Sequence, residues 1–493
     1  MIKNNQEYYL QKAEENLPQL ISNNVIPFSE ATTLNKGDNF IIDLGNHYVG
    51  YFSFSMNYLN SYIDAPIRLL VKFCETKDEI EYDFSAYNGT LCASWLQEEF
   101  INIDYPGVYK MPRRYAARYV KITVLHTPRA FSLSDFCFTA VTSANPQNLE
   151  KIDTNDCLLK KIDSIAVNTL KNCMQRIFED GPKRDRRLWI GDLRLEALTN
   201  YCTFNNLDLV KRCLYLFAAA QTNEKGFLPG YVYENPKFVS GYWFLEDYAL
   251  LFVVSLCDYY NHTKDLKTFL DLYPIAKAQM DAANATLDKN GIITIAKGCD
   301  AFIDWCEGLE KVTALHGVYL YTLNALTEIL SKTGHCDCYL FEERKKNALL
   351  SAKKFLYNKS NNNFVTTYSK SQNSVHSVVW MILGGVISGE NAWEILQNVL
   401  NDSASLKPVT PYMHHYVVEA LIKLDKYEEA FSYIKNYWGK MAELGADTFY
   451  EVFVPEAPET SPYKDKMINS MCHAWSCSPS YFIREFKNKQ KQD

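Results

Sequence analysis

The sequence predicts a mainly α protein in which a β-sandwich, or jelly roll, precedes a large helical domain. Two patterns carry this prediction. Short runs of Val, Ile, Tyr and Phe, separated by turn residues, fill the chain up to residue 145. From about residue 155 onward, apolar residues recur instead with the 3.6-residue period of amphipathic helices. With 493 residues, 47% of them apolar, the chain is long enough for two domains, predicted as residues 1–145 and 146–493.

Five apolar runs predict the strands of the first domain: 40–44, 49–54, 67–73, 119–125 and 135–141. Turn signals such as Gly45-Asn46 and Asn88-Gly89 separate them. Several short strands at this spacing are typical of a β-sandwich or a jelly roll. The polar stretch that follows them, residues 142–150, is the predicted linker.

Apolar stripes predict helices through most of the second domain, for example at 209–217, 243–256, 315–330 and 416–424. At the average length of a helix and its loop, this domain holds about ten to twelve helices. No internal sequence repeat is visible, so a solenoid of near-identical units is disfavoured. Twelve helices paired as six hairpins can close into an (α/α)6 barrel, and that barrel is our hypothesis for the fold.

Composition and charge argue against several classes of partner. Lys and Arg number 51 against 58 Asp and Glu, a net charge of −7, which is unfavourable for binding nucleic acid or an anionic membrane. The N-terminal segment lacks the apolar core of a signal peptide, and no run approaches the ~18 apolar residues of a membrane span. The 14 cysteines are scattered, often within helical apolar patterns, as expected of reduced thiols. We therefore expect a cytoplasmic protein.

One short segment, His335-Cys336-Asp337-Cys338, contains residue types that bind zinc, and His316 precedes it in the chain. Its C-x-C spacing with a single adjacent histidine matches no common zinc site. We therefore predict no metal ion, and we also predict no cofactor.

A thirteen-residue segment concentrates the residue types of carbohydrate chemistry just before a helical pattern. Its candidate site residues are Asp180, Arg184, Asp185, Trp189 and Asp192. Cleavage of a glycosidic bond needs carboxyls in defined protonation states and an aromatic platform for the sugar. A neighbouring guanidinium can hold a carboxylate ionised or bind sugar hydroxyls. The alternative interpretation is a charged helix start with capping and bridging roles only.

Three later loops repeat this combination of acids and aromatic residues. Their candidate residues are Trp243 and Asp247, then Asp304 and Trp305, and finally Glu451 with His473. Loops at one end of an (α/α) barrel line a single cleft, so these segments can meet. Asp247 and Asp304 also suit helix starts, as an acidic first turn and as an N-cap. His473 by itself is equally compatible with a buried structural histidine.

Glu451 has the strongest chemical reason to be functional. It lies among Phe449, Tyr450, Val452 and Phe453, and a carboxylate in such an apolar run is costly to bury unless it is paired. It therefore either finds a bonding partner or takes part in chemistry.

In their order and spacing, these segments resemble the bacterial α-L-rhamnosidases of glycoside hydrolase family 78. The segment from Asp180 to Asp192 is similar to the motif that opens the family's catalytic barrel, Asp-x-Pro-x-Arg-Asp-Glu-Arg-x-x-Trp-x-Gly-Asp. Three later family elements have counterparts here: Asp304-Trp305, the segment from Gly445 to Glu451, and the segment from Asn469 to His473. The N-terminal part resembles the β-domain that precedes the barrel, so the resemblance covers nearly the whole chain.

The resemblance implies an (α/α)6 six-hairpin barrel and an inverting glycosidase. It implies that Glu451 is the general base and that Asp180, Trp189 and Asp192 bind the substrate. One position departs from the family. The family's general acid is the Glu of Arg-Asp-Glu-Arg, and this chain has Arg186 at that place. An arginine cannot donate a proton at neutral pH.

Another carboxyl must therefore act as the general acid if the protein hydrolyses glycosides. We favour Asp192 over Asp185, because Asp185 lies between Arg184 and Arg186. Two guanidinium groups favour the charged carboxylate and suit it to binding rather than to proton donation. Glu196 is a third candidate.

We predict an inverting glycosidase that releases α-L-rhamnose or a related deoxy sugar from small glycosides, with Glu451 as its base. Two alternatives stay open. One is a sugar-binding relative that has lost its acid. The other is a different six-hairpin activity, either unsaturated uronyl hydrolysis or disaccharide phosphorolysis. The predicted partner is a small carbohydrate, with no nucleic acid and no membrane, and the oligomeric state is left open.

Overall fold

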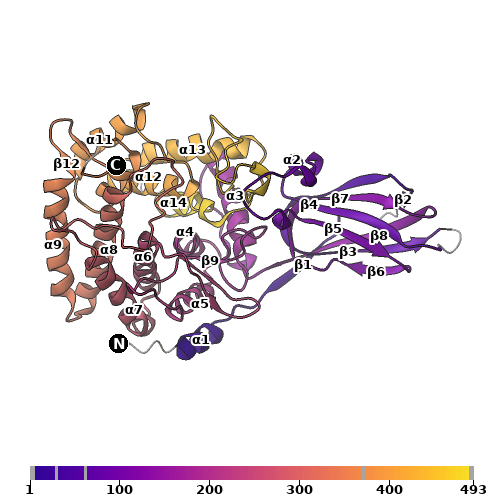
Figure 1. Ribbon diagram of the computed structural model, residues 1–493, viewed down its shortest axis with the longest axis horizontal. Helices are drawn as coiled ribbons and strands as arrows, with labels where there is room; N and C mark the ends of the chain where they lie inside the picture. Colours follow the sequence, from indigo (N-terminus) through magenta and orange to yellow (C-terminus); the bar gives the residue numbers. More distant parts are fainter. Residues whose placement is uncertain (1–5, 28–31, 60–63, 369–371, 488–493) are drawn as a thin grey trace.

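The computed structural model of the chain describes residues 6–27, 32–59, 64–368 and 372–487. A curled β-sheet domain and a larger helical domain lie end to end along its longest axis (Figure 1). This arrangement confirms the predicted fold class. In the part of the chain that the structure describes, no helix combines the length and the apolar character needed to cross a bilayer.

The described residues of the first domain form an antiparallel sheet of eight strands that curls around an aromatic core. The strands are β1 (Ile21–Val25), β2 (Thr32–Leu34), β3 (Asn39–Tyr58), β4 (Ile67–Cys74), β5 (Glu98–Ile103), β6 (Gly107–Lys110), β7 (Tyr115–His126) and β8 (Phe131–Thr142). Their order is β1–β8–β3–β7–β4–β5, with β2 paired to β8 and β6 paired to β3. Alternate residues of β3 point inward, which buries Phe52 and Phe54 against Phe73 and Phe136.

Two details of this sheet differ from the prediction. The predicted turn at Gly45-Asn46 is an irregularity within a single strand, because β3 continues through it while its pairing with β7 shifts between Asp43 and Tyr48. Gly45 has a φ of 79° there, which glycine adopts without a steric penalty. The sequence analysis also missed β1, β2, β5 and β6. These strands are short, and most of their residues are exposed or half-buried, so their apolar alternation is weak.

The described residues of the second domain contain twelve helices. They are α3 (Cys157–Cys173), α4 (Ile190–Tyr201), α5 (Leu207–Ala218), α6 (Glu246–Thr263), α7 (Leu266–Asn284), α8 (Val312–Thr333), α9 (Cys338–Phe355), α10 (Val375–Leu383), α11 (Gly389–Asn401), α12 (Pro411–Lys423), α13 (Tyr427–Glu443) and α14 (Pro479–Phe486). The six even-numbered helices form an inner ring. His415 of α12 packs on Phe482 of α14, and α14 contacts α4, so the ring closes as the (α/α)6 hypothesis predicts.

Burial separates the inner helices from the outer ones. All nine residues of α10 are buried, whereas α11 buries five of its 13 residues along one face. A helix that is buried on every side belongs inside a ring, and an amphipathic helix covers the ring from outside. The predicted stripes do not separate the two rings, because three of the four named, at 243–256, 315–330 and 416–424, fall on the inner helices α6, α8 and α12.

Short elements complete the barrel. A small sheet joins β9 (Leu188–Trp189), β10 (Tyr231–Tyr233) and β11 (Val239–Ser240), and β12 (Tyr357–Asn358) pairs with β13 (Asn363–Phe364). The N-terminal helix α1 (Gln6–Glu15) lies against α5 of the barrel, where Arg212 donates a hydrogen bond to the Ala13 carbonyl at 2.8 Å. Part of the segment that precedes the sheet therefore packs on the helical domain.

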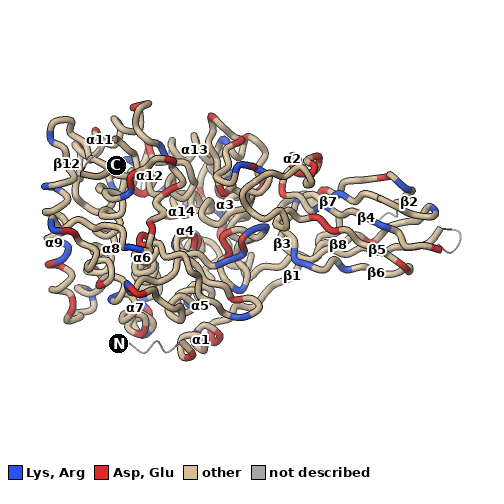
Figure 2. The backbone as a smooth tube through the Cα atoms, in the orientation of Figure 1, with Lys and Arg blue, Asp and Glu red and all other residues tan. Residues whose placement is uncertain are grey.

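Charged side chains join the two domains beside the loops of the barrel. Lys183 is buried between Glu75 and Glu79, which follow β4, at 3.2 and 2.8 Å. Glu79 lies in the short helix α2 (Lys77–Glu81). Arg118 on β7 pairs with Asp447 at 2.6 Å. Figure 2 shows basic and acidic positions close together where the two domains meet.

Candidate active site

The loops that precede the inner helices meet at one end of the barrel, and the predicted site residues lie in or next to them. The ring of Phe302, before α8, stacks on Trp475, before α14, with centroids 5.6 Å apart. Asp304 accepts a hydrogen bond at 2.7 Å from Thr410, the residue that caps α12. The structure thus brings the four predicted segments together. Their helix N-termini present positive dipole ends, which favour carboxylates at this end of the barrel.

Glu451 lies at the centre of these loops, between α13 and α14. Arg184 Nη2 lies 2.6 Å and 2.5 Å from its two carboxylate oxygens. The Tyr463 hydroxyl and the Ser470 backbone N–H also donate to it, at 2.8 and 2.9 Å. Burial acts to raise the pKa of Glu451, but the Arg184 charge and these donors outweigh it and lower the pKa below its ordinary value. Glu451 is therefore ionised at neutral pH.

Asp192, in the first turn of α4, is as buried as Glu451, yet no Lys or Arg among the described residues pairs with it. Its Oδ1 lies 3.5 Å from Nδ1 of His473, whose Nε2 lies 4.0 Å from Glu451. Burial lowers the pKa of His473 to about 4, so this ring is neutral near pH 7. Burial and the adjacent acids Asp180 and Glu451 raise the pKa of Asp192 well above its ordinary value. The surroundings of Asp192 therefore favour its neutral, protonated form.

Two hydrogen bonds between Asp180 and Arg187 close the loop of residues 180–187. The Asp180 carboxylate accepts from the Arg187 backbone N–H at 2.9 Å, and the Asp180 N–H donates to the Arg187 carbonyl at 3.0 Å. Burial raises the pKa of Asp180 to about 8, so its neutral form is favoured as well. The loop is tight enough to require Gly181, because a Cβ at that position would lie 2.1 Å from the Arg184 carbonyl oxygen.

Asp185 is the most open of the three predicted catalytic carboxyls. Its side chain is 17% exposed, compared with 2% for Glu451 and 3% for Asp192. A cis peptide bond joins it to Arg184. Its Oδ1 lies 3.3 Å from Arg184 Nη1, and its Oδ2 lies 3.5 Å from Arg187 Nη1. Because Arg184 contacts Asp185 through one Nη and Glu451 through the other, a single guanidinium stands between these two carboxyls.

Aromatic rings form two groups around the carboxyls. In one group, Trp305 lies edge-on to Trp475 and to Tyr463, with centroid distances of 5.3 and 5.6 Å. In the other, Trp189 lies edge-on to Trp243 at 6.0 Å, and Trp243 is 44% exposed. The three predicted platform residues, Trp189, Trp243 and Trp305, therefore all lie in aromatic groups at the site.

Asp247 and Asp304, predicted to bind the substrate, are buried and already accept hydrogen bonds from the protein. Asp247 accepts from the backbone N–H groups of Phe302 and Ile303 at 2.9 and 2.8 Å. Asp304 accepts from His376 at 2.8 Å and from two backbone N–H groups ahead of α12 at 2.8 and 3.1 Å. Both carboxylates thus hold the loop between α7 and α8 in place. Direct contact of either with a substrate stays a prediction.

The sequence analysis did not identify Tyr463 or Tyr412. Tyr463 donates to Glu451, and the Arg184 guanidinium lies over its ring at 4.5 Å. Tyr412 is buried in the same aromatic wall. Tyr463 lies in an irregular segment, and no local pattern distinguishes it from the other tyrosines among the 34 in the chain. Tyr412 follows Thr410-Pro411, a helix-start signal that places it at a loop end.

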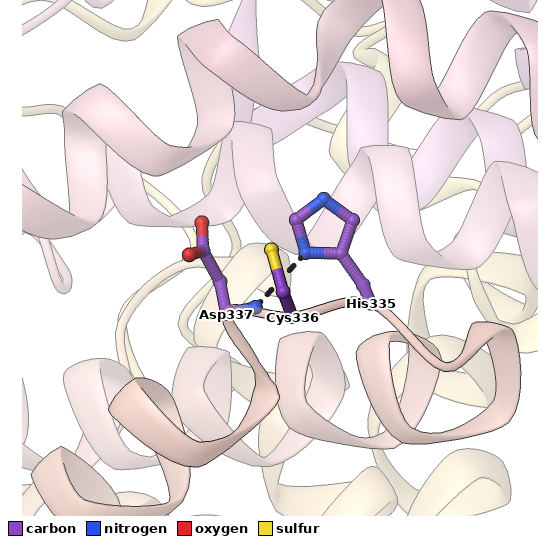
Figure 3. Close-up of side chains that lie close together, drawn as sticks. All are labelled: His335, Cys336 and Asp337. Carbon is purple, nitrogen blue, oxygen red and sulfur yellow. Dashed lines mark hydrogen bonds between the residues drawn. The ribbon is translucent and has the colours of Figure 1, made fainter.

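The turn between α8 and α9 holds the cysteine-containing segment considered for zinc. The ligand atoms of His335, Cys336 and Asp337 lie within 4.8 Å of one another, with the ring and the carboxylate on either side of the thiol (Figure 3). His335 Nδ1 already accepts from the Asp337 backbone N–H at 3.2 Å. The Asp337 carboxylate accepts from Tyr273 at 2.6 Å and lies 3.4 Å from Lys277. These contacts account for the turn without a metal ion.

A carboxyl whose pKa is lowered and two whose pKa values are raised, set among aromatic rings at the end of a six-hairpin barrel, are the combination found in glycosidases. The comparisons with known proteins identify the family. Residues 17–142 match the glycosyl hydrolase family 78 α-rhamnosidase N-terminal domain, and residues 147–486 match the bacterial α-L-rhamnosidase six-hairpin glycosidase domain. The chain belongs to this family of α-L-rhamnosidases, which confirms the resemblance seen in the sequence. No curated protein matches it.

Solved structures agree with this assignment. A rhamnosidase from Klebsiella oxytoca with rhamnose bound is 37% identical, with a TM-score of 0.93, over 98% of this chain and 99% of that one. A family 78 rhamnosidase of Bacillus sp. GL1 is 20% identical, with a TM-score of 0.77, over 93% of this chain and 48% of its own. A Streptomyces avermitilis α-L-rhamnosidase complexed with L-rhamnose is 15% identical, with a TM-score of 0.71, over 94% and 44%. The last two show the fold alone, and this chain spans less than half of their length.

Proposed function

We propose that this protein hydrolyses α-L-rhamnosides with inversion, and that Glu451 is the general base. The observation that carries the proposal is the buried Glu451 carboxylate, kept ionised by Arg184 where the inner-helix loops meet. A base that activates water must be unprotonated in the resting enzyme. The Klebsiella oxytoca relative, a rhamnosidase with rhamnose bound, supports rhamnose as the sugar.

For the general acid we favour Asp185, which reverses the preference drawn from the sequence. Asp185 does contact two guanidinium groups, but at 3.3 and 3.5 Å these contacts are longer than the 2.5 Å contact of Arg184 with Glu451, so the choice depends on exposure. The acid must reach the oxygen of the leaving group, which extends from the sugar toward solvent. Asp185 is 17% exposed, whereas Asp192 is 3% exposed and lies beside the neutral His473. A position behind the sugar suits Asp192 to donating a hydrogen bond to a hydroxyl, a role that its neutral form permits.

Inversion is the mechanism that the family resemblance implies, and it sets the separation that Asp185 and Glu451 need. An inverting enzyme needs about 6.5–9.5 Å between its two carboxyls to admit a water molecule, whereas a retaining one needs about 5–5.5 Å. Here the guanidinium of Arg184 lies between the two carboxyls and contacts both. In this arrangement Arg184 also keeps the base charged while the acid acts on the opposite side of the glycosidic bond.

A panel of aryl glycosides, assayed with and without phosphate, tests this function. We expect turnover of nitrophenyl α-L-rhamnoside that does not depend on phosphate. Proton NMR of the first product formed should show β-L-rhamnose. Phosphate-dependent turnover would indicate a phosphorylase, and release from an unsaturated uronide would indicate a uronyl hydrolase. Binding of rhamnose without turnover of any glycoside would support the sugar-binding alternative.

We also propose a cytoplasmic location. All 14 cysteines are free thiols, including the exposed Cys92, Cys157 and Cys336. Unpaired exposed thiols suit a reducing compartment. Recovery of the native protein from an extracellular fraction would contradict this proposal.

A further inference from the structure

A cavity of about 700 Å³ lies where the sheet domain meets the barrel. One side is lined by residues of the sheet domain, including Tyr51, Trp95 and Arg114. The other side is lined by barrel residues, including Asp185, Arg187 and Tyr233. Its volume falls within the range of about 300–1,000 Å³ typical of small-molecule sites. The proposed function leaves this cavity without a role.

Asp185 connects the cavity to the catalytic carboxyls. Its Oδ1 faces Arg184, which holds Glu451, and its Oδ2 faces Arg187 in the cavity lining. In a glycosidase the general acid stands next to the leaving group. The space that adjoins Asp185 on the side away from Glu451 is therefore where the leaving group lies.

The charges in the cavity lining do not balance. Two of its acids are already paired, Glu179 with Arg114 at 2.7 Å and Glu234 with Arg212 at 2.6 Å, and the third, Asp185, must carry a proton to act as the acid. Two further lining arginines, Arg176 and Arg186, pair with no carboxylate among the described residues.

Arg186 is the more confined of these two cations. Its Nε donates to the Pro182 carbonyl at 2.7 Å, and its Nη2 donates to the Arg114 carbonyl at 2.9 Å. Burial, followed by the charge of Arg114, lowers the pKa of Arg186 to about 10. The nearest acidic influence on Arg186 is Glu179, which already pairs with Arg114, so a bound anion would be the first carboxylate to pair with Arg186 itself.

Aromatic rings form part of the cavity wall. Tyr51 is 49% exposed, and Trp95 is half-buried in the cavity wall. The Arg187 guanidinium lies over the Tyr233 ring at 4.6 Å, which holds that ring in place. Exposed aromatic faces of this kind stack on the ring of a sugar or a phenol.

We propose that this interdomain cavity binds the aglycone, and that the preferred aglycone is a ring bearing a carboxylate that Arg186 and Arg176 neutralise. The inference rests on the proposed function, because the cavity is the leaving-group side only if Asp185 is the acid. It also gives a role to Arg186, which occupies the place of the family's acid. Here that position recognises the leaving group instead of protonating it.

The test compares two substrates that differ in charge alone, 4-carboxyphenyl and 4-carbamoylphenyl α-L-rhamnoside. We expect the wild type to favour the carboxylate about tenfold in kcat/KM, which corresponds to ~1.4 kcal/mol. The preference should fall as salt is added, because screening weakens a charge pair. Arg186→Gln should reduce the ratio of the two kcat/KM values toward one, and Arg186→Lys should retain most of it.

Arg113→Gln is the matched control. It removes a charge beside the cavity but not from its lining, since Arg113 pairs with Glu99 at 2.6 Å, and the ratio should stay within about twofold of wild type. A ratio near one in the wild type, with both substrates hydrolysed, would overturn this inference and leave the proposed function intact. If neither glycoside is hydrolysed, the proposed function fails. Calorimetry of both glycosides with Glu451→Gln then still decides whether the carboxylate binds more tightly.

Discussion

The side chains of Glu451 and Asp192 are almost equally buried, at 2% and 3% exposed, yet their pKa values are shifted in opposite directions. Arg184 lies within 2.6 Å of Glu451, and the pKa of that carboxyl is lowered. The groups nearest Asp192 are a neutral histidine and further acids, and its pKa is raised. Burial by itself disfavours both charges. The comparison shows that two equally buried carboxyls differ in pKa because the Arg184 guanidinium and nearby hydrogen-bond donors face only one of them.

Glu196 extends this comparison. It lies one helical turn beyond Asp192 on α4 and is completely buried, and neither carboxylate oxygen has a hydrogen-bond partner in the described residues. Burial, followed by the charges of Asp192 and Asp180, raises its pKa well above the ordinary value. Its surroundings therefore favour the neutral form, and its isolation from the surface argues against a role as the general acid.

Of the pair Glu451 and Asp192, Glu451 is the residue whose removal should have the largest effect. Glu451→Gln should lower turnover of nitrophenyl rhamnoside by at least ~10²-fold, the usual scale for losing a general base. Glutamine still accepts hydrogen bonds from Arg184, so the variant should fold. Steady-state kinetics and the Tm check this. Glu419→Gln is the matched control, because Glu419 is half-buried and pairs with Arg194 at 3.2 Å but lies outside the site. It should lower the Tm and leave turnover of the folded protein near wild type. Near-normal turnover in folded Glu451→Gln would remove Glu451 as the base.

The second effect separates Asp185 from Asp192 by their dependence on the leaving group. Asp185→Asn should lower turnover of alkyl or sugar rhamnosides by about 10²-fold and affect nitrophenyl rhamnoside much less, because a nitrophenolate leaves without a proton. Asp192→Asn should affect both substrates alike through KM. Kinetics with the two substrate classes distinguish the variants. If Asp192→Asn alone lowered turnover of alkyl or sugar rhamnosides much more than turnover of nitrophenyl rhamnoside, Asp192 would be the general acid, as favoured from the sequence.

The third effect comes from changing the pKa of Glu451 without replacing Glu451 itself. Activity is lost as pH falls through the pKa of the base, and this pKa is lowered, so the acidic limb of kcat/KM should lie below pH 4.5 in the wild type. Arg184→Met leaves Glu451 buried and removes the cation beside it. The pKa of Glu451 should therefore rise, and the acidic limb of kcat/KM should move to higher pH. Arg184→Lys should shift it less. A pH profile of kcat/KM measures each limb, and an unmoved limb in Arg184→Met would contradict the role given to Arg184.

The smallest effect is on stability. The folded pKa of Asp192 lies above its unfolded value, so the folded state holds the proton more tightly, and stability falls as pH rises between the two values. Asp192→Asn removes this pH-dependent loss of stability, because an asparagine side chain does not ionise. The Tm of the variant relative to wild type should therefore be higher at pH 8 than at pH 5. Thermal melts at both pH values measure the difference. If the relative Tm were instead lower at pH 8, Asp192 would be ionised in the folded protein.

The domain order and the helical ring were predictable because their signals are periodic and local. The apolar residues at 209–217 and the apolar run of α10 both lie in largely buried helices. The irregularity at Gly45 was not predictable, because a turn and a bulge within a strand use the same residues. Within the site, the segment from Asp180 to Asp192 could be predicted from its mixture of acids, arginines and a tryptophan, and Glu451 from its apolar neighbours in the chain. Tyr463 could not, because its role depends on a fold that carries it from a remote loop to Glu451 and Arg184.

The sequence by itself determined the fold class, the family and the set of candidate carboxyls, since each of these depends on residue type and spacing along the chain. Only the tertiary structure assigned states to those carboxyls. Arg184 and Glu451 are 267 positions apart, and their contact of 2.6 Å exists only in the folded barrel. The protonation state of a buried acid depends on which charges the fold places beside it, and sequence distance does not encode that placement.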